Sequence, residues 1–262
     1  MRSLCQTILL VSMAGLVSPL SSRATHPDPP LPTLQEIFPH VVERAQRESE
    51  NDRSFESQFS FVKSKVTETL NSKGEVKKHE AKISTNNPAL KKLAGRPAPV
   101  QSRALENGQP VSDRPAKGRG KASEKEKFVV NDDFVKRFEF TLVGRETLNG
   151  RPALVLDFVP AKARLPERDL KDKFFSKTAG RVWLDEEDYA IAKGALRLTD
   201  RVNVVGGLVG AVWKLNFGFE RERTEEGLWF AREAHWHLEG RELFTNRTMD
   251  YHEERTDVRR AQ

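Results

Sequence analysis

The sequence predicts a mainly β protein of the α+β type, in which one helical segment precedes an antiparallel sheet. Two patterns support this prediction. From residue 55 onward, apolar residues alternate with polar ones over most of the chain, and turn-forming residues interrupt the alternation. The spacing typical of an amphipathic helix is clear only over residues 33–48. With roughly eight to eleven strands, such a sheet must curl or close.

The N-terminus has the pattern of a signal peptide over residues 1–24. Arg2 gives a positive start, the apolar run Ile8–Leu20 follows, and Ser22 and Ala24 stand at the positions that a signal peptidase reads. The run is shorter than the roughly 20 residues that a membrane-spanning helix needs. We therefore expect cleavage after Ala24 and a soluble periplasmic or secreted protein.

The rest of the chain, residues 25–262, is predicted to form a single β domain. The composition of the whole chain supports one core, because 37% of the residues are apolar and 31% are charged, and there are 15 Phe. The only cysteine, Cys5, lies within the signal peptide. The mature chain therefore has no thiol for a disulfide, a metal site or nucleophilic catalysis.

Residues 33–48 are predicted to form an amphipathic helix that covers one face of the sheet. Thr33 and Glu36 have the spacing of a capping box. Pro39 removes one backbone hydrogen bond, so we expect a kink there. The apolar positions follow helical spacing and fall on one side, namely Leu34, Ile37, Phe38, Val41, Val42 and Ala45.

The remaining elements are predicted as strands joined by hairpin turns. The first begins at Phe55 and turns at residues 71–74, and residues 149–150 (Asn-Gly) give a strong later hairpin signal. The C-terminal part is the clearest. Residues 213–219 and 228–238 alternate so that their large apolar side chains share one face. Successive hairpins of this kind predict a meander with one buried face.

Residues 86–127 interrupt this pattern with a basic segment that contains several prolines. It holds ten Lys or Arg against four Asp or Glu, a surplus of six that equals the net charge of the whole chain, +6. We expect a mobile insertion, either simply solvated or in contact with an anionic membrane surface. The segment has no aromatic residue to stack on bases, so nucleic acid is not an expected partner.

Three motifs resemble the outer-membrane lipoprotein-sorting protein family, whose members have the fold of the periplasmic lipoprotein carrier. They are Gly144–Ala153, Gly180–Ile191 and Leu228–Phe244. The resemblance covers most of residues 33–257 and implies a curved, incomplete barrel whose concave apolar face is covered by one or a few helices. In the carrier, that cavity holds the acyl chains of lipoproteins, and relatives act as sensors of envelope stress. The insertion at residues 86–127 has no counterpart in the carrier.

The sequence supplies no recognisable active site. His235 and His237 lie on one strand face and suit zinc, but no third ligand matches their register, so a solvated polar face is the preferred interpretation. The carboxylates at residues 132–133 and 186–188 occur in turn-like segments, where carboxylates are usually solvated. The motifs of serine hydrolases, phosphate-binding loops and zinc proteases do not occur. We therefore expect no enzyme activity, no cofactor and no metal.

We expect the concave face to bind a lipid or a lipoprotein acyl chain. Arg232 interrupts an apolar face, so it either meets the polar head of such a ligand or swings to solvent at a bulge. The alternative is an envelope interaction or sensor protein with a packed interior, and an open cavity of several hundred Å³ favours the carrier. The ligand-binding candidates are Phe59, Phe61, Phe140, Leu142, Phe217, Phe219, Arg232, Trp236 and Leu243.

Overall fold

The computed structural model describes residues 29–89, 101–107, 109–110, 130–163, 165–204 and 210–261. The predicted signal peptide and most of the basic insertion lie outside the described residues. The chain separates into two units, Met1–Pro30 and Leu31–Gln262, and every element below belongs to the second unit. None of the helices in the described ranges has the length and apolar character that a membrane crossing requires.

Two consecutive helices open this unit, α1 (Leu34–Gln46) and α2 (Glu48–Gln58). The predicted capping box is confirmed. The backbone N–H of Thr33 donates to the carboxylate of Glu36 at 2.7 Å, and the N–H of Glu36 donates to the Thr33 hydroxyl at 3.3 Å. The helix continues through Pro39 to its end at Gln46. The cap therefore starts α1 at the residue that the sequence predicts.

Helix α2 corrects the sequence-based assignment of a strand that begins at Phe55. Phe55 lies inside α2, and its ring stacks on Phe59 and Phe61 of strand β1 (Phe59–Leu70) at ring-centre distances of 5.2 and 5.4 Å. The four-residue spacing from Phe55 to Phe59 fits one face of a helix as well as one face of a strand. Only the packing of the ring against the sheet decides between the two.

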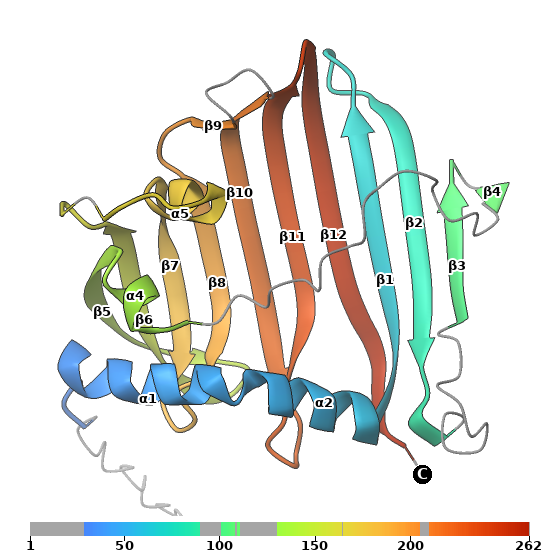
Figure 1. The fold of residues 1–262 in the computed structure, drawn as a ribbon. Coiled ribbons are helices and arrows are strands. Elements are labelled where there is room, and N and C mark those ends of the chain that lie inside the picture. Colours follow the sequence, from blue (N-terminus) through green and yellow to red (C-terminus); the bar gives the residue numbers. More distant parts are fainter. Residues whose placement is uncertain are drawn as a thin grey trace, which may run out of the picture. The chain divides into compact units, whose positions relative to one another are not determined.

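A single antiparallel sheet follows the helices (Figure 1). It has twelve strands in the described part of the chain, in the order β4-β3-β2-β1-β12-β11-β10-β8-β7-β6-β5, with β9 paired to β10. The edge strands do not pair with each other, so the predicted antiparallel sheet, short of a closed barrel, is confirmed. After β1, the strands are β2 (Val76–Asn86), β3 (Gln101–Glu106), β4 (Gln109–Pro110), β5 (Phe138–Leu148), β6 (Arg151–Pro160), β7 (Thr178–Asp185), β8 (Ile191–Leu198), β9 (Val202–Val204), β10 (Gly210–Arg223), β11 (Trp229–Glu242) and β12 (Thr245–Arg260).

The first and last long strands meet in the middle of the sheet. Strand β1 pairs with β12 from Phe59, opposite Arg260, to Leu70, opposite Thr248. The sheet is therefore more than the predicted meander, because the β1–β2 hairpin joins it beside the C-terminal strand.

Part of the predicted mobile insertion forms regular structure, which differs from the sequence-based expectation. Gln101–Glu106 is strand β3, which pairs antiparallel with β2, and β4 extends the sheet beyond it. The segment gave no strand signal because it has few apolar residues. A strand near a sheet edge needs only its backbone groups to join the ladder.

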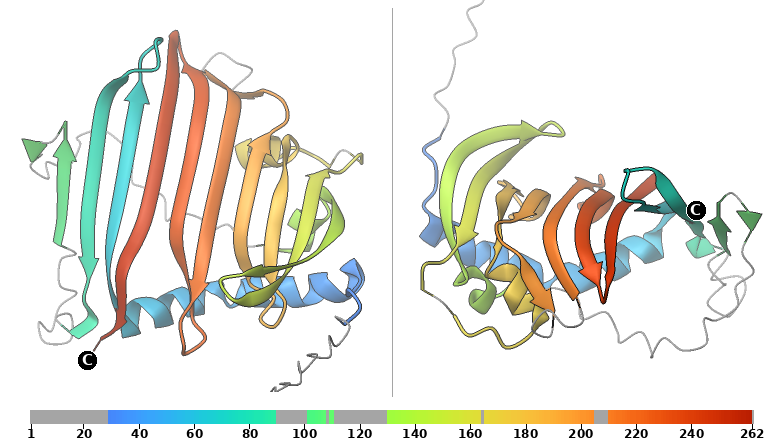
Figure 2. Two further views of the ribbon diagram at one scale, coloured as in Figure 1. Left: turned by 180° about the vertical axis from the view of Figure 1, so that it is seen from behind. Right: turned by 90° about the horizontal axis from the view of Figure 1, so that it is seen from above.

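Helices α1 and α2 run across the strands on the concave side of the sheet (Figures 1 and 2). Under α1, the buried residues Ile37 and Val41 pack with Leu154 and Leu156 of β6 and with Leu184 of β7. The predicted apolar side of this helix therefore faces the sheet. A second cluster lies under α2 and contains Phe55, Phe59, Phe61 and Phe230.

Side chains replace the hydrogen bonds between strands where β11 and β12 separate. The pairing of these strands ends at Glu233. Beyond it, the Asn51 side chain of α2 accepts a hydrogen bond from the Trp229 N–H at 2.9 Å and donates one to the Trp229 carbonyl at 2.6 Å. Arg255 donates to the carbonyl of Ala231 at 2.6 Å. These bonds replace missing ladder bonds, and the Asn51 pair holds α2 on the sheet.

Candidate functional site

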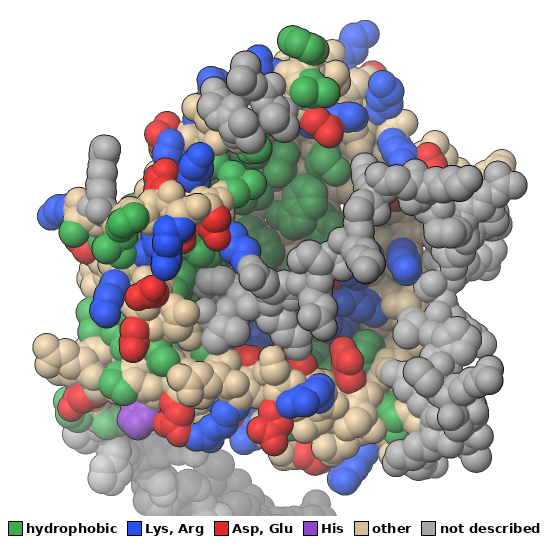
Figure 3. Space-filling view, in the orientation of Figure 1, with side chains coloured by type: hydrophobic (Ala, Val, Ile, Leu, Met, Phe, Trp, Pro, Cys, Tyr) green, Lys and Arg blue, Asp and Glu red, His purple; other side chains and the backbone are tan. Residues whose placement is uncertain are grey.

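A cavity of about 640 Å³ lies between the helices and the concave face of the sheet. Strands β5–β8 and β10 line it together with α1, the first residues of α2, and two short helices, α4 (Asp132–Val135) and α5 (Leu170–Phe175). In Figure 3, hydrophobic side chains line the hollow in this face. The volume falls within the roughly 300–1,000 Å³ that is typical of small-molecule sites.

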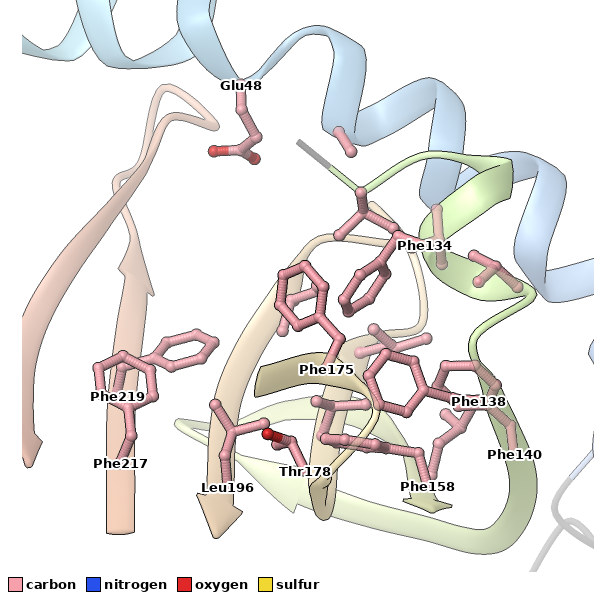
Figure 4. A pocket seen from close by; sticks show the side chains of 18 of the residues that line it. Glu48, Phe134, Phe138, Phe140, Phe158, Phe175, Thr178, Leu196, Phe217 and Phe219 are labelled. Carbon is pink, nitrogen blue, oxygen red and sulfur yellow. The ribbon is translucent and has the colours of Figure 1, made fainter. Parts of the chain in front are cut away.

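Aromatic rings form one end of the cavity (Figure 4). The ring of Phe138 lies 5.0 Å, centre to centre, from the rings of Phe134 and Phe158. From strand β10, Phe217 and Phe219 face this group across the cavity, with their own rings 5.7 Å apart. Such walls can contact an alkyl chain over a large area without needing a polar partner.

The two short helices bring additional rings to the cavity. Asn131 accepts a hydrogen bond from the N–H of Phe134 at 2.9 Å and caps α4, while Asp169 accepts one from the N–H of Asp172 at 2.8 Å and caps α5. Phe175 of α5 thereby lies in the cavity wall. Neither helix was predicted from the sequence, because four and six residues are too few for a periodic pattern. The available signal was the residue type at each cap.

Charged side chains stand at the rim, where α1 meets α2. Arg221 of β10 donates to the Glu48 carboxylate at 2.7 Å, and Arg44 lies 3.3 Å from the same carboxylate. The Arg221 guanidinium also lies 5.9 Å from the centre of the Trp229 ring. Glu48 (Figure 4) therefore joins the helices to the sheet beside the cavity.

Three of the predicted ligand-binding residues line the cavity, namely Phe140, Phe217 and Phe219. Leu142, two residues after Phe140, is partly buried and packs against the core cluster under α1. The period-two alternation of β5 and β10 therefore identified two strands that contribute to the cavity.

Three further candidates share the concave face but lie outside the cavity lining. Phe59 and Phe61 are buried in the packed cluster under α2. Trp236 lies opposite Phe217 in the β10–β11 ladder, and its ring stacks on Tyr251 at 5.3 Å. Because paired residues point to the same face, Trp236 and Tyr251 extend the aromatic surface from the cavity toward β12.

Arg232 and Leu243 do not lie at the cavity. The register of the β10–β11 ladder shifts at Arg232, whose side chain is 50% exposed and forms an ion pair with Glu222. Of the two interpretations of Arg232, the bulge that swings it to solvent is therefore the observed one. Leu243 occupies the turn between β11 and β12, with a φ of 53° and an exposed fraction of 55%.

The lining residues of β6, β7 and β8 were not predicted from the sequence. Strand β6 is buried on both faces over Ala153–Leu156, so its apolar run gives no alternation from which a face can be assigned. Phe158, Thr178 and Leu196 line the cavity from these three strands.

The carboxylates weighed as catalytic candidates form ion pairs or lie in the first turn of a helix. Glu186 receives two hydrogen bonds from Arg145, each of 2.5 Å. Burial raises the pKa of Asp188, but hydrogen bonds from an indole N–H and from Arg223 outweigh it and hold that pKa below its usual range. Residues 132–133 are exposed in the first turn of α4. These contacts give the carboxylates structural roles.

The two histidines lie on the convex face, away from the cavity. His235 is exposed, whereas His237 has Nε2 3.0 Å from Glu239 and Nδ1 2.6 Å from Asp250. The hydrogen bond with Glu239, together with that to Asp250, raises the pKa of His237. Across the described residues, no three His, Cys, Asp or Glu side chains come together as a possible metal site.

No family model and no curated protein matches this chain. Solved structures are similar to it over most of its length. An outer membrane lipoprotein-sorting protein domain from Vibrio parahaemolyticus has 16% identity and a TM-score of 0.31, with 84% of this chain and 91% of that chain covered. A LolA superfamily protein from Nitrosomonas europaea has 11% identity and a TM-score of 0.29, with 88% and 94% covered.

A DUF1329 family protein from Desulfovibrio piger is similar to the same degree, with 13% identity, a TM-score of 0.31, and 86% of this chain and 92% of that chain covered. The first two of these structures carry the family description that the sequence motifs resemble. At these TM-scores the similarity is loose.

Proposed function

We propose that this chain is a non-enzymatic binding protein that holds the acyl chain of a lipid or lipoprotein in the cavity beside α1. The observation that carries this proposal is a cavity of about 640 Å³ with aliphatic and aromatic walls. The alternative, an envelope interaction or sensor protein, requires a packed interior. Packing of that kind occurs under α2, whereas the space beside α1, α4 and α5 is open.

The apolar walls can supply useful affinity without any polar contact. Each buried CH₂ group contributes about 0.8 kcal/mol. An acyl chain with about 14 buried CH₂ groups therefore contributes about 11 kcal/mol, and a cost of association of about 4 kcal/mol leaves about 7 kcal/mol. This corresponds to a dissociation constant of about 10 μM, which is suited to reversible binding.

The proposal is tested by titrating the purified chain with the neutral fluorescent probe 1-N-phenylnaphthylamine. We expect saturable binding that Leu196→Trp weakens, because Leu196 lines the cavity and a larger ring occupies the space of the probe. Val159→Trp is the matched control, since Val159 is 49% exposed and lies outside the cavity lining. Equal probe binding by both variants, or none by the unaltered chain, would refute the proposal.

We further propose that the chain acts in the periplasm or as a secreted protein, on the basis of residues 1–24. Expression with these residues present, followed by N-terminal sequencing of the exported product, is expected to give a chain that begins at Thr25. A product that keeps Met1 and stays inside the cell would contradict this.

The basic segment at residues 86–127 is proposed to contact an anionic membrane surface.

A further inference from the structure

A group of charged side chains lies on the concave face beside the cavity. In the β1–β12 ladder, Lys63 stands opposite Arg255 and Lys65 opposite Glu253. Paired residues point to the same face of a sheet, as do residues two apart on one strand. Phe61, two residues before Lys63, packs against α2, so these side chains share the side of the sheet that the helices cover.

The carboxylate of Glu253 contacts several donor groups of this set of side chains. The ammonium groups of Lys63 and Lys65 lie 2.5 and 2.9 Å from the two carboxylate oxygens of Glu253, and the Tyr251 hydroxyl donates to it at 2.6 Å. The exposed fractions of the Lys63, Lys65 and Glu253 side chains are only 22%, 33% and 15%. The Glu253 carboxylate therefore already contacts three donor groups, and it is shielded from water.

Arg255 adds a third positive charge next to them. Its guanidinium lies 5.6 Å from the centre of the Phe61 ring and donates to the carbonyl of Ala231. Its Nε is buried and has no hydrogen-bond partner among the described residues. A buried donor without a partner is costly, so an acceptor that reaches it gains free energy.

The group therefore carries three positive charges against one negative charge. Burial is the main cause that lowers the pKa of Lys63, although Glu253 opposes this effect. Lys82, which is exposed, stands opposite Lys65 in the β1–β2 ladder and adds positive charge to the same face. In Figure 3, Lys and Arg side chains are visible next to the hydrophobic hollow, over β1 and β12.

Aromatic residues connect the cavity to this charged group. Phe219 of the cavity wall pairs with Ala234, and Ala234 pairs with Glu253. With neighbouring strands about 4.8 Å apart, Glu253 lies about 10 Å from Phe219. In the next row, Phe217 of the cavity wall pairs with Trp236, whose ring stacks on Tyr251 at 5.3 Å, so aromatic rings continue from β10 to β12. An amphiphile with its chain in the cavity can therefore place its head over β12.

We propose that Lys63, Lys65 and Arg255 bind the oxyanion head, a phosphate or a carboxylate, of an amphiphile whose chain lies in the cavity. This inference rests on the proposed function. The ligand class is thereby an anionic lipid. Glu253 acts as the internal counter-ion of the site, and its negative charge competes with the head group for Lys63 and Lys65.

The test compares twelve-carbon competitors of 1-N-phenylnaphthylamine at pH 7.5, namely dodecyl phosphate, dodecanoate and neutral dodecanol. We expect the anionic competitors to displace the probe at concentrations about tenfold lower than dodecanol does, as one charge-assisted hydrogen bond allows. Lys65→Met is expected to remove most of this preference. Glu253→Gln is expected to increase it. Comparison of dodecyl phosphate with dodecanoate shows which oxyanion the site prefers.

Lys214→Met is the matched control, because Lys214 also bonds to a single glutamate, Glu239 at 2.6 Å, but lies on the convex side with His237. It is expected to leave the preference for anions unchanged. If the three competitors displace the probe equally, or if Lys65→Met and Glu253→Gln behave like the unaltered chain, the head-group site is refuted while the cavity proposal stands. If the probe itself does not bind, the proposed function fails.

Discussion

Replacing Asn51 with Ala should destabilise the protein by about 3 kcal/mol. The side chain of Asn51, 7% exposed, makes two hydrogen bonds to the backbone of Trp229, at 2.6 and 2.9 Å. Trp229 lies beyond the last β11–β12 pair. Truncation of Asn51 therefore leaves the Trp229 N–H and carbonyl without a hydrogen-bond partner on the side of β12. Each buried backbone group that loses its partner costs about 1–3 kcal/mol, so the two groups together cost about 2–6 kcal/mol. Partial entry of water keeps the loss in the lower half of this summed range, at about 3 kcal/mol.

Urea unfolding followed by tryptophan fluorescence measures this loss, because Trp229 itself is buried in the contact. The matched control is Asn216→Ala, since Asn216 is exposed on β10 and should change the free energy of unfolding by less than about 0.5 kcal/mol. A similar midpoint for Asn51→Ala and the unaltered chain would show that α2 is held by its apolar face alone. The reasoning about the parted strands would then be wrong.

Three further predictions concern the cavity wall, the charged group and the hairpin tip. In Gly194→Ala, the new Cβ would stand 2.4 Å from the ring of Phe219, so the ring should move into the cavity and the neutral probe should bind severalfold more weakly in titration. Burial raises the pKa of Glu253, but Lys63 and other partners outweigh it and lower the pKa from 4.5 to about 2. The stability that this gives is complete above pH 4.5 and is lost as the pH falls toward 2, so urea midpoints should drop over that window, and less steeply in Glu253→Gln. Phe244 is 97% exposed, so Phe244→Ser should leave the midpoint unchanged, and a clear loss would reveal a contact that the fold does not explain.

The elements that sequence patterns predicted are those whose signals are local. The capping box at Thr33 starts α1, and alternation over residues 213–219 and 228–238 corresponds to β10 and β11 with Phe217 opposite Trp236. In both cases, neighbouring residues along the chain carry the signal, although the bulge at Arg232 interrupts the alternation in β11.

The elements that escaped prediction depend on distant contacts. Helix α2 has a polar sequence in which Phe55 is the one large apolar side chain, and it is stabilised by the aromatic cluster on β1 and β11. The alternation placed Phe59 and Phe140 on the same concave face, but it gave no means of telling that one is covered by α2 and the other lines a cavity. That distinction depends on where the helices cross the sheet, and residues far away in sequence set the crossing.

The central β1–β12 pair has a consequence for biogenesis. Residues that are about 200 positions apart, Phe59 and Arg260, are neighbours, so β1 and β2 have no route into the sheet until the last strand has been synthesised. Sheets that depend on such long-range closure fold slowly. Until synthesis is complete, the edge of β11 that β12 will cover stays unpaired, and the part of the concave face that β12 and β1 form does not yet exist.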